Sequence, residues 1–405
     1  MGRHGTRSQQ SDTVDADTRR HGRRHEAPID IATLIAEEIG PRPPMSLGEA
    51  KTAALLDARL RRVGMRLSAE SYHASRLPGY DSITVGILAL IGVASFFWMP
   101  LPAIALFAAC FGTALLMLVY GDGPLLARRA PSQNVVATRA AGELQRWRLV
   151  LLAPLCSPPA AGRLMAAFGH SLSGRILRVA AAAILLALGI AAALLPGSEA
   201  RVWLWYLQAL PTTALLLLGV AALAVQFAPA TPGAINYAGA LATLIGSAAA
   251  LQDLANTELW IVGVGAADSR AGINDLLRRY PFDPVQTLFV GLDGIGAGTL
   301  CYLAAEGTWR LRLADALLLR LAARVVDGGQ ATAAPRAYRG GPTLAGALRH
   351  RGLRAMTIAS LDAGQHVPRQ YDRDDTIAAI DPVHLDTAVR LVVALARALD
   401  AEPRT

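Results

Sequence analysis

Two long apolar segments most constrain what this chain can fold into. Residues 82–121 contain no Asp, Glu, Lys or Arg, and this run is about twice the ~20 residues that an α-helix needs to cross a bilayer. The sequence WMPLP at 98–102 interrupts it and predicts a hairpin of two helices. Residues 179–197 and 202–228 form a second apolar pair. The sequence therefore predicts four transmembrane helices in two hairpins, and the alternative of four buried helices in a soluble protein fits these lengths less well.

The charges beside the apolar segments predict on which side of the membrane the rest of the chain lies. The short turn of the second hairpin carries only Arg201, offset by Glu199. An even number of spans returns the chain to one side, and the positive-inside rule makes that side cytoplasmic. We expect an integral protein of a bacterial cell membrane with a cytoplasmic soluble domain. The arginines that flank the spans on that side are Arg76, Arg128, Arg129, Arg175 and Arg178.

The net charge of +8 has a simple origin in a basic N-terminal tail and in these flanking arginines. Residues 1–27 have no apolar core and predict a disordered tail. Anionic lipid explains the positive charge, because no basic stripe with interleaved aromatic residues points to nucleic acid. We therefore expect the lipid bilayer as a partner and no nucleic acid. Three cysteines in apolar surroundings imply no disulfide framework and suit a reducing compartment.

The remaining segments, 28–81, 122–172 and 229–405, predict one α/β domain, with hairpins at 82–121 and 173–228 inserted into it. Strand and helix patterns alternate along these segments, and several strands are apolar on both faces. This arrangement is typical of a three-layer α/β sandwich with a mostly parallel, mixed central sheet. The predicted strands are 65–72, 133–140, 146–155, 258–266, 285–298 and 353–363. The predicted helices are 29–42, 46–64, 233–254, 269–280, 313–326 and 381–401.

Six sequence segments in this order resemble those of a known family. They include QNVVATRAAGELQRWRLVLLAPLCS, PGAINYAGALATLIGSAAAL, WIVGVGAADSRAGINDLL and LFVGLDGIGAG. The family is the di-zinc aminopeptidase and glutamate-carboxypeptidase-like family, metallopeptidase family twenty-eight, and the resemblance covers nearly all of the soluble sequence. It implies a zinc-exopeptidase fold. It also implies two Zn²⁺ ions about 3.5–4 Å apart, a bridging carboxylate and a Glu that deprotonates the bridging water.

The resemblance places altered residues at three of the metal-binding positions. The His-x-Asp of the first parallel strand falls on Pro154 and Cys156. Proline offers no ligand atom. The bridging Asp falls on Asn236, whose neutral amide is a poor bridge between two cations. The resemblance therefore implies a weakened or absent di-metal centre, in a chain that departs from the family at its most demanding positions.

The second half of the expected site departs from the family in the same way. The Glu-Glu pair falls on Ala267 and Asp268, so the general-base position carries a methyl group. The strand carboxylate is kept as Asp293, and the last His falls on Tyr371. Asp268 and Asp293 are the only residual metal ligands, and two carboxylates hold Mg²⁺ or Ca²⁺ weakly at best. We therefore expect no catalytic residue and no bound cofactor.

These positions predict a membrane-anchored, peptidase-like protein that has lost zinc-dependent aminopeptidase activity. It would serve as a platform for a peptide, a lipid head group or another membrane protein. One alternative is a membrane-bound metallo-exopeptidase with a rearranged zinc site, for which Cys156, Asp293 and His366 are the candidate ligands. A structural assembly subunit is a third possibility. If the first strands run up, down and up, both hairpins leave the sheet at the edge where α/β proteins bind ligands, so that edge should face the bilayer.

Overall fold

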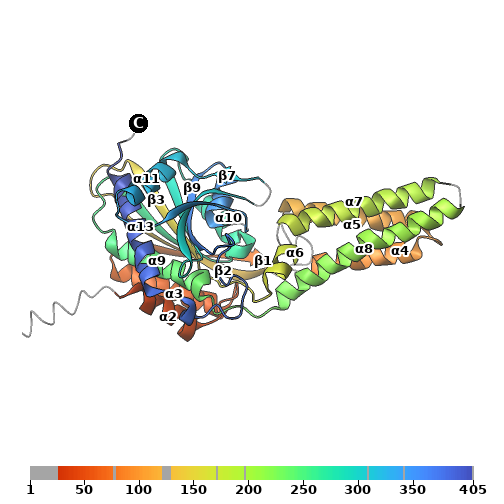
Figure 1. Ribbon diagram of the computed structural model, residues 1–405, viewed down its shortest axis with the longest axis horizontal. Coiled ribbons are helices and arrows are strands. Elements are labelled where there is room, and N and C mark those ends of the chain that lie inside the picture. Colours follow the sequence, from red (N-terminus) through yellow and green to blue (C-terminus); the bar gives the residue numbers. More distant parts are fainter. Residues whose placement is uncertain are drawn as a thin grey trace, which may run out of the picture.

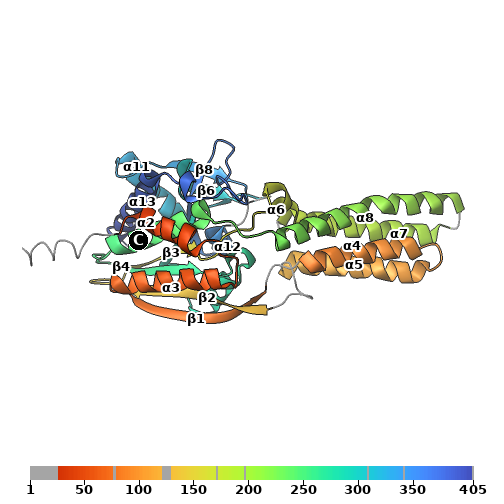
Figure 2. The same ribbon diagram turned by 90° about the horizontal axis from the view of Figure 1, so that it is seen from below.

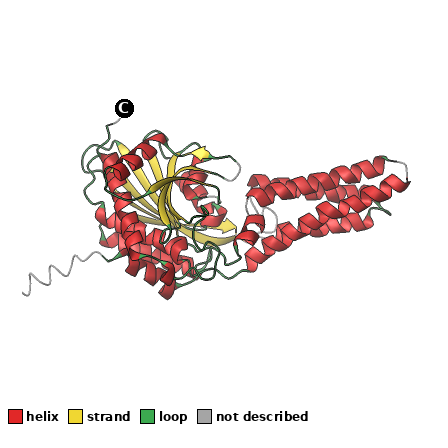
Figure 3. Cartoon of the chain, in the orientation of Figure 1, coloured by secondary structure: helices red, strands yellow, loops and turns green. Residues whose placement is uncertain are grey.

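The computed structural model describes residues 26–75, 79–120, 129–169, 172–195, 198–307, 310–340 and 343–403. It has two parts, an α/β domain and a bundle of long helices that projects from one end of that domain (Figures 1 and 2). All the strands drawn lie in the α/β domain (Figure 3). Residues 1–25, most of the predicted tail, lie outside the described residues.

A nine-stranded mixed sheet forms the middle layer of the α/β domain, which fits the expected sandwich. Its strand order is β1-β2-β4-β3-β5-β9-β6-β7, with β8 beside β6. The parallel strands β4, β3, β5 and β9 make its centre. The strands are β1 Arg66–Ser75, β2 Arg129–Arg139, β3 Trp147–Pro154, β4 Thr257–Val264, β5 Thr287–Asp293, β6 Thr299–Glu306, β7 Arg312–Leu313, β8 Ala334–Tyr338 and β9 Arg354–Leu361.

The sheet is mixed, as predicted, with parallel strands at its centre. Among the described strands, the pairs β3–β4, β3–β5, β5–β9 and β6–β8 are parallel, and the pairs β1–β2, β2–β4, β6–β7 and β6–β9 are antiparallel. The antiparallel pairs lie at the two sides of the sheet. On one side, the apolar hairpin between β1 and β2 leaves and re-enters at the same edge, which reverses the chain. On the other side, β6, β7 and β8 have no counterpart among the predicted strands.

Helices cover both faces of the sheet, and alternate residues of each central strand point to opposite faces. Leu149 and Leu151 of β3 pack with α2, α3, α9, α11 and α13, whereas Val150 and Leu152 pack with α10 and α12. The helices of the domain are α2 Pro28–Thr33, α3 Leu47–Arg62, α9 Gly239–Ala250, α10 Ala271–Arg279, α11 Ala316–Asp327, α12 Leu344–Arg349 and α13 Pro382–Asp400. Single turns are η1 Leu34–Ile39, η2 Ala234–Ala238, η3 Ala267–Ser269 and η4 Ile377–Ala379.

Side-chain caps explain where several of these helices begin. Ser46 accepts a hydrogen bond from the Glu49 N–H at the start of α3. Asp315 caps α11 and Asp381 caps α13 in the same way. The Glu49 carboxylate, however, bonds to residues of the sheet rather than to the start of its own helix. Helix α3 is thereby tied to the strand edge described below.

The projecting bundle consists of two helical hairpins and one short helix at its base. Phe107 lies at its centre, and a Cβ added to Gly92 or Gly189 would lie 2.5 or 2.7 Å from its ring. These glycines therefore let the helices approach closely, as is common between membrane helices. The helices are α4 Gly79–Ser95, α5 Pro100–Tyr120, α6 Arg163–Gly169, α7 Leu172–Leu194 and α8 Ser198–Phe227.

Three helices of the described chain, and not the four predicted, are long and apolar enough to cross a membrane. They are Pro100–Val119, Leu172–Leu194 and Glu199–Phe227. The exception is α4, whose apolar part is Tyr80–Ser95. At ~1.5 Å per residue its 17 residues extend about 25 Å, short of the ~30 Å hydrocarbon core. It nevertheless packs along α5 and α8 (Figure 2).

Both hairpins leave the sheet from one edge, as expected. β1 is antiparallel to β2, and β2 is antiparallel to β4, so β1, β3 and β4 run in the same direction. β1 leads into α4, and the segment after β3 leads into α6 and α7. The bundle therefore projects from the edge where the parallel strands end (Figure 1).

Candidate functional site

The predicted site residues lie around the ends of the parallel strands β3, β4 and β5, on the side of the sheet from which the bundle projects. β3 ends at Pro154 and β5 ends at Asp293. Ala267 and Asp268 follow β4, and Asn236 lies in the turn before α9. Since the carboxyl ends of parallel strands share one edge, this is the usual place for a ligand site in an α/β protein.

The residues at the end of β3 are buried and mostly apolar. The Leu155 N–H continues the sheet by donating to the Val264 carbonyl at 2.9 Å. The Cys156 side chain is fully buried, and burial, followed by the carboxylates of Asp268 and Glu49, raises the pKa of its thiol well above the ordinary value. A thiol with such a pKa stays protonated at neutral pH, whereas metal binding requires the thiolate. Pro154 and Cys156 therefore offer no metal ligand in this state.

Asn236 is held in place by one carboxylate. Asp375 accepts the N–H groups of Ile235 and Asn236 at 2.8 and 3.1 Å and the Asn236 Nδ2 at 3.0 Å. Nδ2 also donates to the Pro368 carbonyl at 3.1 Å. The Asn236 Oδ1 is buried and accepts no hydrogen bond within the described structure. This position thus carries an oriented amide with one unused acceptor.

Ala267 and Asp268 stand on a tight turn after β4. Ala266 has a left-handed backbone (φ 41°), and its N–H donates to Glu49 Oε2 at 3.0 Å. Residues Ala267–Ser269 then form a single 3-10 turn. The Ala267 side chain is a methyl group and cannot accept a proton. Asp268 is partly exposed and lines a cleft described below.

Asp293 is the most perturbed carboxyl group of the site. It is 8% exposed, and its Oδ1 accepts no hydrogen bond within the described structure. Burial first, and then the charges of Glu306 and Asp268, raise its pKa to about 8. Gly294 follows with a φ of +53°, and a Cβ there would lie 2.2 Å from Val367. The glycine-rich segment 291–298 is therefore a tight strand exit, as the glycine spacing indicates.

Tyrosines take the space around these carboxylates. Tyr371 has a left-handed backbone (φ 64°). Burial and the carboxylates of Asp268 and Asp293 raise the pKa of its phenol. The same two carboxylates, after burial, raise the pKa of the Tyr237 phenol well above its ordinary value. The two phenols therefore lie close enough to Asp268 and Asp293 for the charges of these groups to act on them.

A polar network that the sequence reading missed supports the turn after β4. Glu49 is buried, and its Oε1 accepts the Ser132 hydroxyl at 2.6 Å. Tyr72 donates to the Gly265 carbonyl at 2.7 Å. Burial raises the pKa of Glu49. No local sequence signal could connect Glu49 with Ser132 on a distant strand.

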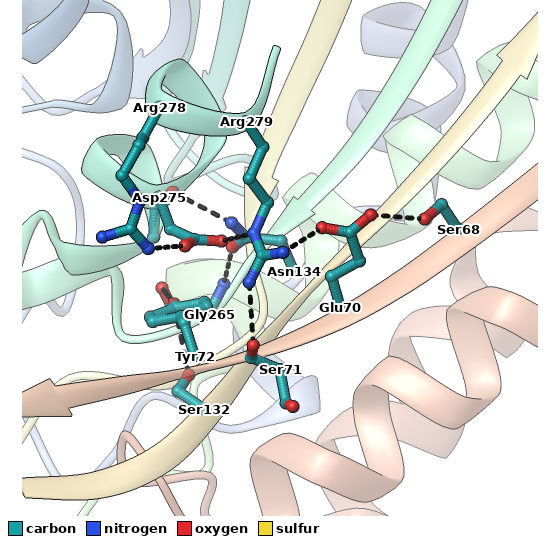
Figure 4. A network of polar contacts seen from close by, with 11 residues as sticks. Ser68, Glu70, Ser71, Tyr72, Ser132, Asn134, Gly265, Asp275, Arg278 and Arg279 are labelled. Carbon is teal, nitrogen blue, oxygen red and sulfur yellow. Dashed lines mark hydrogen bonds and ion pairs between the residues drawn. The ribbon is translucent and has the colours of Figure 1, made fainter.

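Figure 4 shows how this network continues to the outer strand β1. The Asn134 Oδ1 accepts the Gly265 N–H at 3.1 Å. Arg279 of α10 bridges the Asp275 carboxylate at 2.8 Å and the Glu70 carboxylate at 2.6 Å. The residues beneath the site are thus satisfied by one another, in contrast to the unused acceptors of Asn236 and Asp293.

The alternative site of Cys156, Asp293 and His366 does not form. His366 is exposed, and its Nδ1 lies 3.9 Å from Asp362 Oδ1. The charged groups that affect Cys156 are Asp268, Glu49 and Arg42. In the described part of the chain, no group of three or more His, Cys, Asp and Glu side chains is placed to hold a metal ion. The described residues therefore do not fit a di-zinc centre.

A cleft connects Asp268 with the base of the bundle. It is narrow, since the centres of water-sized molecules can occupy only about 50 Å³ of it. One wall is the end of α8 and the residues after it, and the opposite wall is a proline-rich loop. Most of the lining is apolar, so the cleft joins the polar strand edge to the helices. Its lining residues are Pro43, Pro44, Met45, Ser157, Pro159, Val225, Gln226, Ala228, Ala230, Asp268 and Ser269.

The sequence matches no protein-family model, and no curated protein matches it. Similar solved structures include BSAP, a zinc aminopeptidase from Bacillus subtilis, with 10% identity, a TM-score of 0.55 and coverage of 91% of this chain and 93% of that one. The aminopeptidase from Aneurinibacillus sp. strain AM-1 has 12% identity, coverage of 91% and 92%, and a TM-score of 0.54. A Zn-dependent exopeptidase from Parabacteroides distasonis has 12% identity, coverage of 91% and 96%, and a TM-score of 0.50. The chain has the fold of zinc aminopeptidases and exopeptidases.

Proposed function

We propose that this chain is a membrane-anchored protein of the zinc-exopeptidase fold that has lost zinc-dependent peptide hydrolysis and binds a ligand at the former active edge. The observation that carries the proposal is the set of side chains at that edge. The family resemblance implies metal ligands or a base at Pro154, Asn236, Ala267 and Tyr371. Pro154 and Ala267 have no side-chain atom for either role, and Asn236 and Tyr371 offer only a neutral amide and a neutral phenol.

Loss of hydrolysis follows from two independent deficits. A di-zinc hydrolase needs several anionic or imidazole ligands to hold its metals, and only Asp268 and Asp293 remain as carboxylates. It also needs a group that removes the proton from the attacking water, and the Ala267 methyl cannot do so. Either deficit alone would lower the rate by orders of magnitude, because general-base catalysis contributes about 10²–10⁴-fold.

Anchoring in a membrane is supported by the surface of the bundle. Large apolar side chains on α7 and α8 are exposed, among them Ile184, Leu210 and Leu217. At the far end of the bundle, Trp98 is 81% and Trp203 is 69% exposed. Tryptophan is enriched where a protein crosses the membrane interface. The lipid bilayer is therefore the first partner that we propose.

We further propose that the α/β domain lies on the cytoplasmic side of a bacterial cell membrane. Arg129, Arg175 and Arg178 lie on the domain side of the helices, and the positive-inside rule places such residues in the cytoplasm. Arg76 and Arg128, which also entered the prediction, lie outside the described residues. A cysteine-labelling experiment with a membrane-impermeant maleimide on intact cells would test this orientation, for example at Asp386→Cys on the exposed surface of α13. Labelling before lysis would contradict it.

The function is tested on the full chain purified in lipid nanodiscs. Zinc is measured by elemental analysis, and hydrolysis of aminoacyl reporter substrates is measured with added Zn²⁺ or Co²⁺. We expect no stoichiometric zinc and no metal-dependent hydrolysis, for the wild type and for the control Asp386→Ala alike. Two zinc ions per chain, with hydrolysis that Asp293→Ala abolishes, would establish the metallo-exopeptidase alternative instead.

A further inference from the structure

Helix α6 lies where the bundle meets the α/β domain (Figure 2). Two longer helices beside it, α7 with 23 residues and α8 with 30, pack along each other, and α8 begins four residues after α7 ends. Their far ends therefore lie at one level, and α8 reaches about 10 Å further toward the domain at ~1.5 Å per residue. Since α7 alone is long enough to cross the ~30 Å hydrocarbon core, the last two turns of α8 extend into the head-group layer.

These last turns of α8 are the part against which α6 packs. Gly169 at the end of α6 is buried, and a Cβ added there would lie 3.0 Å from Val225 and 3.1 Å from the Ala221 carbonyl oxygen. Arg178 of α7 also donates to the carbonyl groups of Gly169 and, at 3.4 Å, of Phe168. The contacts with α7 and α8 thus fix α6 at the level of the head groups.

The outward face of α6 is apolar. Leu164 is 63%, Met165 is 39% and Phe168 is 41% exposed. Their spacing of one and four residues places them on one face of the helix, whereas Gly169 lies on the face toward α8. A seven-residue helix that turns all its large apolar side chains away from the protein is unusual in water, and such an exposed patch indicates a contact surface.

Aromatic and basic side chains lie at the same level on neighbouring elements. Tyr80 at the start of α4 and Phe227 at the end of α8 are both exposed, and their ring centroids are 6.1 Å apart in an edge-on arrangement. The Arg163 side chain, in the first turn of α6, is 45% exposed. Tyrosine and arginine are typical of the boundary between the hydrocarbon core and water. The surroundings of α6 therefore have the composition of a membrane interface.

We propose that α6 is an interfacial helix that lies in the head-group layer, with Leu164, Met165 and Phe168 inserted among the first methylenes of the lipid chains. The inference rests on the proposed function, because it requires α7 and α8 to span a bilayer. It adds a second contact with the membrane, made by a helix that does not cross it. Such helices bury their apolar face about 5–10 Å into the boundary between head groups and acyl chains.

A bilayer fits this face better than a second protein does. A stable protein interface buries about 800 Å² on each partner, much more than three partly exposed side chains provide. The face is also continuous with the exposed apolar surface of the bundle, since Leu172 and Leu177 of α7 are exposed as well. The lipid that surrounds α7 would therefore meet α6 without a separate binding event.

The start of α6 is bonded to the former active edge. The Gly162 N–H donates to the Tyr371 carbonyl at 3.0 Å, and Arg163 donates to the Val367 carbonyl at 3.1 Å. The loop that contains both carbonyls also accepts the amide of Asn236. An α6 fixed in the head-group layer would thus hold this loop, and the former active edge beneath it, at the membrane surface.

Spin labels on the full chain in lipid nanodiscs test the depth of α6. The three native cysteines are fully buried, so labels attach at Leu164→Cys or Phe168→Cys. Collisions with oxygen and with a water-soluble nickel chelate report the depth of each label. Asp386→Cys on α13 is the control in water, and Leu210→Cys, at a position of α8 that is 76% exposed, is the control among acyl chains. We expect both α6 labels about 5–10 Å below the phosphate level, between the two controls.

Each other result contradicts a defined part of the inference. An α6 label as accessible to nickel as the Asp386→Cys label would place α6 in water, and one as deep as Leu210→Cys would place it in the hydrocarbon core. Low access to both reagents would mean that protein covers the face. In these three cases only the inference fails. A Leu210→Cys label in water would instead overturn the membrane anchoring in the proposed function.

Hydrogen exchange in nanodiscs tests whether the apolar face holds the helix and its loop. The double variant Leu164→Ser/Phe168→Ser should exchange the amides of residues 163–169 and 362–371 about tenfold faster than wild type, because the lipid contact no longer opposes local opening. The matched control Val383→Ser, at an exposed apolar position of α13, should leave both segments unchanged. Thermal unfolding verifies that each variant folds. Exchange equal to that of wild type in the double variant would overturn the inference.

Discussion

Glu49 and Asp293 are both buried carboxyl groups near the carboxyl edge of the sheet, and they are satisfied to very different degrees. Glu49 accepts a hydrogen bond on each oxygen, from the Ser132 hydroxyl and from the Ala266 N–H. The Asp293 Oδ1 accepts none within the described structure. Burial is the largest cause of the raised pKa in both. The difference between them lies in their partners.

The contrast separates a group that completes the fold from a group with an unused acceptor. Removing one partner from a satisfied buried network leaves the other partners orphaned, which costs about 1–3 kcal/mol for each group. A group whose own acceptor is already unused loses little when it is replaced. Substitutions around Glu49 should therefore affect stability, whereas substitutions at Asp293 should affect binding and the pH dependence of stability.

The largest effect is expected for Glu49→Ala. It would orphan the Ala266 N–H, leave the Ser132 hydroxyl with only the Tyr72 hydroxyl at 3.3 Å, and leave a cavity beneath the turn that carries Asp268. We expect a loss of about 3 kcal/mol in the free energy of unfolding, measured by chemical denaturation in nanodiscs. Glu70→Ala, at a more exposed glutamate of the neighbouring network, is the matched control and should cost less than about 1 kcal/mol. A Glu49 variant as stable as this control would contradict a supporting role for the network.

Asp375→Asn should have the next largest effect, a loss of about 2 kcal/mol in the free energy of unfolding. Its carboxylate accepts three hydrogen bonds, two from backbone N–H groups and one from the Asn236 amide. The asparagine side chain would place its own N–H₂ group against these donors, which cannot accept a hydrogen bond from it. Asp374→Asn, next in the chain and exposed, is the control. Equal melting temperatures for the two variants would show that Asp375 does not hold the turn.

Ser132→Ala should have a smaller effect of about 1 kcal/mol. It removes one donor to Glu49 but keeps the Ala266 N–H on the other carboxylate oxygen. Combined with Glu49→Ala, it should add little, because both variants break the same hydrogen bond. A double-mutant cycle measures this coupling. Fully additive effects would mean that Ser132 and Glu49 act separately.

The sequence predicted the strands and helices of the domain better than the long-range hydrogen bonds between them. Buried strands such as β3 and β5 are marked by continuous apolar runs, and the helix predicted from residue 46 does begin after its cap Ser46. The family resemblance pointed to Ala267 and Asp293, and the structure places them at or just beyond the ends of the parallel strands β4 and β5. Glu49, however, meets Ser132 and Ala266 across 83 and 217 residues of chain. No local pattern encodes such contacts.

Strand β8 and the short length of α4 were missed for similar physical reasons. β8 contains Pro335 and Arg336 and is largely exposed, so it lacks the apolar alternation of a strand. Its pairing with β6 depends on a distant neighbour. The shortness of α4 was hidden because the uncharged run continues without a break into the hairpin turn. Apolar length in the sequence is thus an upper limit on helix length.

Asp293→Asn should give the smallest change at low pH and one that grows with pH. The pKa of Asp293 is raised from 3.8 to about 8 in the fold, so between these values the native state keeps a proton that the unfolded chain releases. Stability from this group is therefore complete below about pH 4 and is lost as the pH rises through 8. Asparagine does not titrate, so the melting temperature of the variant relative to wild type should rise between pH 5 and pH 8.5. Asp386→Asn, at an exposed position, should show no such trend, and a constant offset for Asp293→Asn would mean that its carboxyl group is ionised in the native state.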